Sequence, residues 1–177
     1  MDYLYNSDII DLAFDKAEEW HGEQKYGDQP YIVHLKEVYD LVFNKVKDTP
    51  HGYRNLCLIV ALLHDSLEDT KAKSSEIASL FGIPAALAIE CLTDGDGINR
   101  KERKRRSYHR IRSNDVTILI KVADRLANMR NCLRSGNTGL LKMYIKEYDA
   151  FHAGLWSPYQ IIEDWWDELD EIVSSNR

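Results

Sequence analysis

The sequence feature that most constrains the fold is an unbroken run of eight apolar residues, Leu56–Leu63. A helix that is apolar on every face must be covered on all sides, so this run predicts the central helix of a packed bundle, which we expect to extend over residues 53–69. At its end stand four titratable residues, His64, Asp65, Glu68 and Asp69. At about 100° per residue, these four side chains would leave one side of that helix together.

Such a cluster needs compensating charge. Burial of ionised carboxylates without partners costs on the order of several kcal/mol, so the four groups must bind a cation or be paired with bases. Imidazole and carboxylate together suit a divalent transition metal such as manganese, iron or zinc. The alternative is an exposed helix end that is acidic by chance, although acidic side chains at a helix C-terminus oppose the helix dipole.

Further ligands for a metal ion have to come from elsewhere in the chain. His34 follows the apolar segment 31–33, and Asp124 follows the largely apolar segment 116–123. Either residue, taken alone, would more often be structural. Three polar side chains share the face of a predicted helix with Asp124. These are Lys121, Asn128 and Asn131.

Elsewhere the spacing of apolar residues predicts helices joined by turns. We expect helices at 7–22, 31–46, 74–81, 84–92, 115–130, 139–153 and 157–174, a turn at 25–31, and loops at 48–52 and 93–97. Residues 116–120 are strand-like, but they continue into a helical pattern and no partner strand is evident. The sequence thus predicts an all-α, single-domain helical bundle over residues 1–177. Three tryptophans should anchor its last helix, namely Trp156, Trp165 and Trp166.

The composition excludes several other classes of protein. A formal net charge of −6 and a pI near 5.5 are incompatible with the broad basic surface that holds nucleic acid. No apolar stretch approaches the roughly 20 residues that cross a bilayer, and the start lacks a signal-peptide pattern, so we expect a cytoplasmic protein without membrane contact. The three widely spaced cysteines are typical of reduced core residues. These are Cys57, Cys91 and Cys132.

The order His34, His64-Asp65, Asp124 resembles the H…HD…D pattern of the HD-domain phosphohydrolase superfamily. Within it, the chain is similar to the hydrolase domain of the RelA/SpoT alarmone enzymes and, in size, to the stand-alone small alarmone hydrolases of the metazoan SpoT homologue type. The matching segments are 21–24, 30–34, 61–70, 81–82, 92–94 and 120–130. The resemblance implies an HD-domain helical bundle.

The resemblance also implies roles for individual residues. The metal ligands of that family are the positions of His34, His64, Asp65 and Asp124, and the usual metal is manganese, although another divalent transition metal would suit the same donors. The acidic pair that matches Glu68-Asp69 activates the attacking water. For the family, the reaction removes the 3′-pyrophosphate from guanosine tetra- or pentaphosphate.

The substrate side of the pocket departs from the family pattern. By resemblance, Asn128 should touch the nucleotide sugar, and Lys25 stands where the family has an arginine near the base and phosphates. The family's Arg-Lys-Ser-Gly turn is replaced by 25–28, which brings in Tyr26, and a frequent threonine is Asn131. Another nucleotide therefore stays open as the substrate: an adenine alarmone, the 2′-phosphate of a nicotinamide dinucleotide phosphate or a nucleoside monophosphate. A non-catalytic nucleotide sensor is the third hypothesis.

A basic run, Arg100–Arg106, places six cationic residues among seven. Lys101 and Lys104 could reach the distal phosphates of a substrate, whereas the alternative is a solvated helix face. Tyr148 lies on a predicted helical face with Tyr144 that could bind a nucleotide or simply pack. The expected partner is thus a small nucleotide; the sequence predicts neither an oligomeric state nor a regulator.

Overall fold

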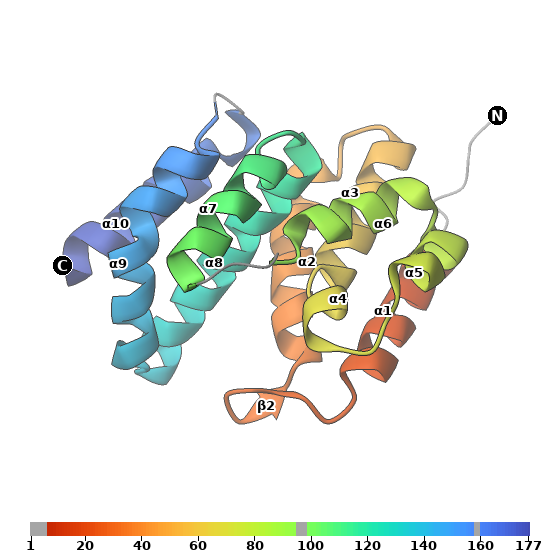
Figure 1. The fold of residues 1–177 in the computed structure, drawn as a ribbon, viewed down its shortest axis with the longest axis horizontal. Helices are drawn as coiled ribbons and strands as arrows, with labels where there is room; N and C mark the ends of the chain where they lie inside the picture. Colours follow the sequence, from red (N-terminus) through yellow and green to blue (C-terminus); the bar gives the residue numbers. More distant parts are fainter. Residues whose placement is uncertain (1–6, 95–98, 158–159) are drawn as a thin grey trace. The chain divides into compact units, whose positions relative to one another are not determined.

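The computed structural model describes residues 7–94, 99–157 and 160–177, and these are almost entirely helical (Figure 1). The all-α prediction is confirmed. The described strands are two residues each, β1 (Lys25–Tyr26) and β2 (Gln29–Pro30), paired antiparallel in a hairpin. The chain divides into two compact units, Met1–Thr93 and Asp94–Arg177, which are described separately below.

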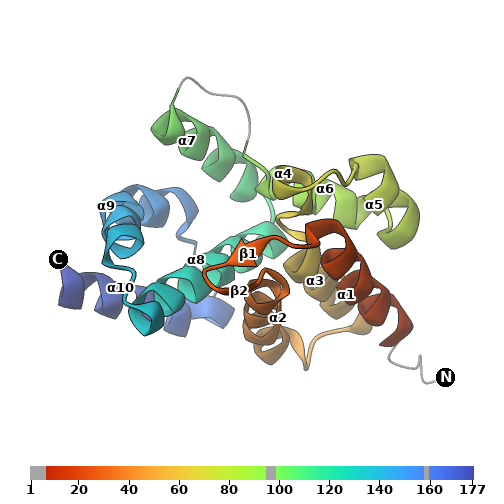
Figure 2. The ribbon, with the colours of Figure 1, turned by 90° about the horizontal axis from the view of Figure 1, so that it is seen from below.

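The first unit is built around the predicted central helix. Its helices are α1 (Ser7–His21), α2 (Ile32–Val46), α3 (His51–Leu63), α4 (Ser66–Asp69), α5 (Ser74–Phe81) and α6 (Ile83–Leu92). Helix α3 packs against α1, α2 and α6, and every side chain from Cys57 to Leu63 is buried (Figure 2). The all-round apolar run is therefore covered on all sides, as the sequence predicts.

The central helix is shorter than the sequence predicts. It ends at Leu63, and His64 and Asp65 form a turn before the short helix α4 begins. One reason is local: Nδ1 of His64 lies 2.8 Å from the carbonyl oxygen of Ala61, which a continuing helix would offer to the amide of Asp65. The predicted helix over 53–69 is wrong in this respect, so the four titratable residues do not share one helix.

The second unit contains α7 (Arg100–Ile111), α8 (Asp115–Ser135), α9 (Thr138–Leu155), a 3₁₀ turn at Gln160–Ile162 and α10 (Glu163–Asn176). The strand-like start of α8 is helical, as predicted. The side chain of Asn114 accepts the amide of Val116 at its beginning, and Gly136 in the left-handed conformation ends it. Both helix boundaries thus follow from ordinary capping residues.

Aromatic rings fill the core of this second unit. Phe151 is fully buried and its ring lies 5.6 Å from that of Trp166. Trp165 and Trp166 are buried in α10, as predicted for anchoring residues. Trp156 is 51% exposed, so its predicted anchoring role is wrong. Trp156 lies between α9 and α10 and not on the buried face of either helix.

Two further expectations can be compared with the structure. Cys57 and Cys132 are buried free thiols and Cys91 is a partly buried one, so none of the three forms a disulfide, as predicted. Within the described ranges, every helix is too short or too polar to span a bilayer.

Candidate functional site

The position of His64 is determined by the end of the buried helix α3. Its side chain is 1% exposed, and its Nδ1 atom lies 2.8 Å from the carbonyl oxygen of Ala61. Because a carbonyl oxygen only accepts, Nδ1 must carry the proton, which leaves the lone pair of the neutral ring on Nε2. This is the tautomer that a metal-binding histidine needs when it coordinates through Nε2.

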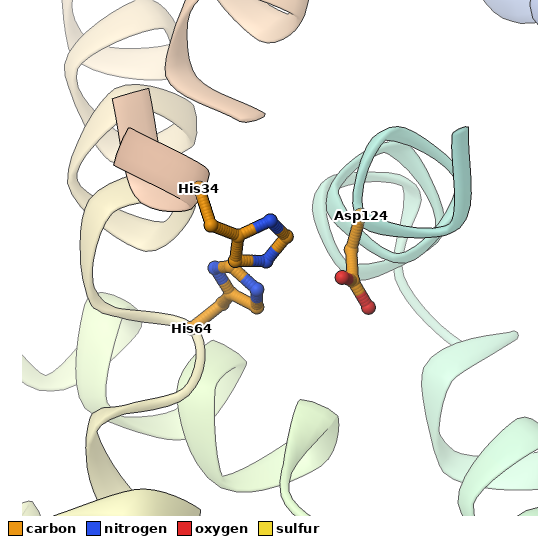
Figure 3. Close-up of side chains that lie close together, drawn as sticks. All are labelled: His34, His64 and Asp124. Atoms are coloured by element: carbon orange, nitrogen blue, oxygen red, sulfur yellow. The ribbon is translucent and has the colours of Figure 1, made fainter. Parts of the chain in front are cut away.

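The carboxylate of Asp65 faces the Nε2 atoms of both His64 and His34. Oδ2 of Asp65 lies 3.1 Å from Nε2 of His64 and 3.8 Å from Nε2 of His34. His34, on α2, is also 1% exposed, and its ring centroid is 5.5 Å from that of His64. Figure 3 shows the two imidazole rings lying against each other. The first unit thus brings together two buried imidazoles and one carboxylate, a donor set that suits a divalent transition metal.

The acidic pair Glu68 and Asp69 lies on the short helix α4, directly after the turn that holds Asp65. Both residues are exposed. Oδ2 of Asp69 accepts a hydrogen bond of 3.0 Å from the side-chain amide of Gln24. Exposed carboxylates next to buried imidazoles can take protons from water, which is the chemistry expected of a general base.

Asp124 lies on α8 in the second unit and is 8% exposed; Figure 3 shows its side chain leaving that helix. Its Oδ1 atom accepts from Asn128 at 2.5 Å, and its Oδ2 atom is 2.8 Å from the ammonium of Lys121. The predicted polar face of this helix is confirmed for these three residues. Asn131 is half-buried one turn further along.

Two of the predicted phosphate and nucleotide contacts already have partners. Nζ of Lys104 lies 2.9 Å from Asp94, and the hydroxyl of Tyr148 donates to Asp170 at 2.8 Å. Burial alone would raise the pKa of Asp94, but hydrogen bonds from Lys104 and Ser107 outweigh it and lower that pKa. The side chain of Lys101 lies outside the described part of the structure.

The hairpin carries the remaining predicted contacts. Lys25 is exposed at the start of β1, and the ring of Tyr26 lies 4.7 Å from the ring of His34. Tyr26 therefore borders the histidine pair directly.

Three residues of the site were missed by sequence reasoning. The hydroxyl of Tyr31 donates to Oδ2 of Asp65 at 2.5 Å, Gln24 holds Asp69, and the buried ring of His21 stacks on Tyr31. All three lie in segments that match the family, 21–24 and 30–34, which was the available signal. Spacing alone could not reveal them, because Tyr31 and Asp65 are 34 positions apart in the chain.

Several relatives of the chain are guanosine-3′,5′-bis(diphosphate) 3′-pyrophosphohydrolases, and others are GTP pyrophosphokinases of the rsh type. No protein-family model matches the chain. It is 32% identical to the guanosine-3′,5′-bis(diphosphate) 3′-pyrophosphohydrolase MESH1 of Xenopus tropicalis, over 79% of this chain and 78% of that protein. The corresponding mouse protein is 30% identical over 80% and 79% of the two chains.

Longer relatives match as well. The chain is 31% identical, over 92% of its length, to the guanosine-3′,5′-bis(diphosphate) 3′-pyrophosphohydrolase of Aquifex aeolicus, and spans 24% of that enzyme. Among solved structures, a metazoan orthologue of SpoT that hydrolyses ppGpp superposes with a TM-score of 0.69 over 94% of each chain. At 24% identity, this last likeness shows the shared fold.

Proposed function

Because the chain belongs to the MESH1 family of guanosine-3′,5′-bis(diphosphate) 3′-pyrophosphohydrolases, we propose that it removes the 3′-pyrophosphate from guanosine tetra- or pentaphosphate. The observation that carries the proposal is the arrangement in the first unit. Asp65 faces the Nε2 atoms of two buried histidines, and the exposed acidic pair follows it within one short helix. These groups can hold a divalent ion and take a proton from water, which together serve metal-assisted phosphate hydrolysis.

The proposed metal ligands are His34, His64, Asp65 and Asp124. His34, His64 and Asp124 are each buried and each offer a ligand atom, and the tautomer of His64 presents Nε2 for coordination. Two imidazoles and two carboxylates suit manganese, our proposed ion, or another divalent transition metal. When bound, the ion would polarise the phosphoryl group and offset its negative charge. We further propose that residues 1–177 form one HD-type domain.

The acidic pair Glu68 and Asp69 is the proposed general base. One of these carboxylates accepts a proton from the water whose oxygen bonds to the phosphorus attached to the 3′ oxygen. The bond between that phosphorus and the 3′ oxygen breaks, the 3′ oxygen takes up a proton, and pyrophosphate and the nucleoside 5′-diphosphate or 5′-triphosphate are released. Oδ2 of Asp69 already accepts a hydrogen bond from Gln24. If Asp69 is the base, we therefore propose its Oδ1 atom as the one that takes the proton from the water.

Some of the proposed substrate-binding residues could contact the nucleotide directly, whereas others would first have to leave a carboxylate partner. Lys25 and Tyr26 on the hairpin, together with Asn128 and Asn131 on α8, would meet the nucleotide directly. Three other proposed residues would exchange a present carboxylate partner for substrate. These are Lys104, Lys121 and Tyr148. Lys101 completes the set as a cation of the basic run. Location in the cytoplasm is part of the same proposal.

A second candidate keeps the metal centre and changes the substrate. The hairpin carries Tyr26 against His34 and ends its turn with the exposed Asp28, in place of the family's Arg-Lys-Ser-Gly. An acidic residue at this edge disfavours phosphate there, which would favour another nucleotide. A non-catalytic sensor is the remaining alternative.

The test is a pyrophosphate-release assay on the purified chain with manganese and a panel of nucleotides. We expect release from guanosine tetraphosphate, and a loss of about 10²- to 10⁴-fold in kcat for Asp69→Asn. The matched control is Asp40→Asn, which changes an exposed aspartate of α2 and should keep wild-type activity. Cleavage of a different nucleotide alone would establish the second candidate, and binding without cleavage of any would establish the sensor.

A further inference from the structure

Behind the proposed site lies a small group of side chains between the end of α1 and the start of α2. We infer that Tyr31 is a positioning residue that holds the ligand Asp65 for the metal ion, and that His21 supports both Tyr31 and the water-activating Asp69. This inference rests on the proposed function and adds residues that neither coordinate the metal nor touch the substrate in that proposal.

The first step is the contact between Tyr31 and Asp65. The phenol donates to Oδ2 at 2.5 Å, and this same oxygen lies 3.1 Å from Nε2 of His64. A hydrogen bond to a carboxylate is shorter and stronger than one between neutral groups, so it restricts the rotation of the Asp65 side chain. Ligating carboxylates need such partners, because their orientation is part of metal affinity.

Tyr31 also links two ligand-bearing segments. It immediately precedes α2, and His34 follows one turn later, with the two ring centroids 5.5 Å apart. The hydroxyl reaches across to the turn after α3, where Asp65 lies. A single side chain therefore fixes the carboxylate from the α3–α4 turn relative to the imidazole from α2.

His21 extends this support to the acidic pair. Its ring is 6% exposed and stacks on Tyr31 at 4.6 Å with an interplanar angle of 17°. Its Nδ1 atom lies 2.8 Å from Oε1 of Gln24, whose amide nitrogen donates to Asp69. Because the amide oxygen only accepts, Nδ1 of His21 carries the proton. One histidine thus contacts, through two neighbours, both the metal ligand and the proposed base.

The surroundings of His21 favour the neutral form of its imidazole ring. Burial lowers its pKa, and this effect outweighs the hydrogen bond to Gln24 and the nearby carboxylates of Asp65 and Asp69. Within the described residues, its Nε2 atom is buried and has no hydrogen-bond partner. The ring therefore acts through stacking and through its single donor.

The test removes one oxygen atom. Tyr31→Phe keeps the ring that stacks on His21 and deletes only the hydroxyl. We expect manganese affinity, measured by titration of the metal-free full-length chain, to fall roughly 10- to 100-fold, as for the loss of other partners of metal ligands. Helix content by circular dichroism should not change, and saturating manganese should restore most of the activity.

A matched control is Tyr39→Phe on α2. Tyr39 packs its ring against Phe14 and Phe43, so removal of its hydroxyl should leave manganese affinity at the wild-type value. Gln24→Leu separates the two branches of the support. It should lower kcat about 10-fold with unchanged metal affinity, because Asp69 is a proton acceptor and not a ligand.

The outcomes are distinguishable from those of the proposed function. Wild-type manganese affinity in Tyr31→Phe would overturn the positioning role. A loss of activity in this variant that saturating manganese does not restore would overturn it as well. A wild-type chain that binds no divalent ion would overturn both proposals. A chain that binds manganese but leaves guanosine tetraphosphate intact would refute the substrate alone, and the Tyr31 comparison would still be decided by the binding data.

Discussion

Substitution of Gly154 by alanine provides a sharp test of the packing between α7 and α9. A Cβ atom added at Gly154 would lie 2.8 Å from Cδ2, 3.0 Å from Cβ and 3.1 Å from Cγ of Tyr108. Tyr108 is 5% exposed and its ring packs edge-on against Phe151 at 5.8 Å. Two of these atoms belong to the buried ring and the third is Cβ, so the side chain cannot swing away from all three without moving the backbone of α7.

Two opposing effects determine how much Gly154→Ala changes the free energy of unfolding. Alanine is a better helix former than glycine by about 1 kcal/mol, which would stabilise α9. Overpacking of a buried contact costs about 1–3 kcal/mol. Since one of these contacts falls below 3.0 Å and the other two lie at 3.0 and 3.1 Å, we place the cost in the upper part of that range and expect a net loss of about 1–2 kcal/mol in the free energy of unfolding. For a chain of this size, that corresponds to a fall in Tm of roughly 2–8 °C.

The assay is thermal and urea unfolding followed by circular dichroism, and the same helix offers the control. At Gly139, an added Cβ would meet only Oδ1 of Asn137 at 3.8 Å, which is ordinary contact. Gly139→Ala should therefore leave stability unchanged or raise it by up to about 1 kcal/mol. If Gly154→Ala proves as stable as wild type, the close packing of α7 on α9 is wrong.

Two other predictions concern charge and metal. Asp94→Asn should destabilise the chain by about 1–2 kcal/mol at pH 7, because hydrogen bonds to charged partners are lost. Asp94 has a lowered pKa in the folded state, so its contribution is present above its ordinary value of 3.8 and disappears as the pH falls through the folded pKa. The difference in stability between variant and wild type should thus narrow below about pH 4; a constant difference down to pH 2 would contradict the assignment. Removal of metal with a chelator should lower Tm and stop pyrophosphate release, and added manganese should restore both, because an ion that binds only the folded state stabilises it. An unchanged Tm would count against a manganese-binding chain.

The sequence was most informative where one physical requirement dominated. The run Leu56–Leu63 had to be covered on all sides, and all of it except the partly buried Leu56 is buried in α3. The strand-like start of α8 was predicted to be helical because no partner strand was evident, and it is. These predictions needed only periodicity and the absence of a competing partner.

The predictions that are wrong, and the site residues that were not predicted, depend on contacts between a side chain and the backbone or between distant segments of the chain. The break after Leu63 accompanies the hydrogen bond of His64 to Ala61, which no apolar pattern encodes. Trp156 was expected in the core because large aromatic residues favour burial, but it lies between two helices and is exposed. The residues His21 and Tyr31 could be recognised only once the start of α2 was seen beside the turn after α3.

The hairpin of residues 25–30 lies where mutations can accumulate during evolution without disturbing the core. Most of its side chains are exposed, and its tip turns at Gly27 in the left-handed conformation. His34 belongs instead to a buried position of α2, and His64 and Asp65 belong to the turn that follows the buried helix α3. Exchanges in an exposed loop seldom disturb a covered core. Apart from Tyr26, whose ring lies against His34, the hairpin can therefore change by mutation while the buried histidines stay in place, so the proposed substrate contacts can evolve independently of the proposed metal ligands.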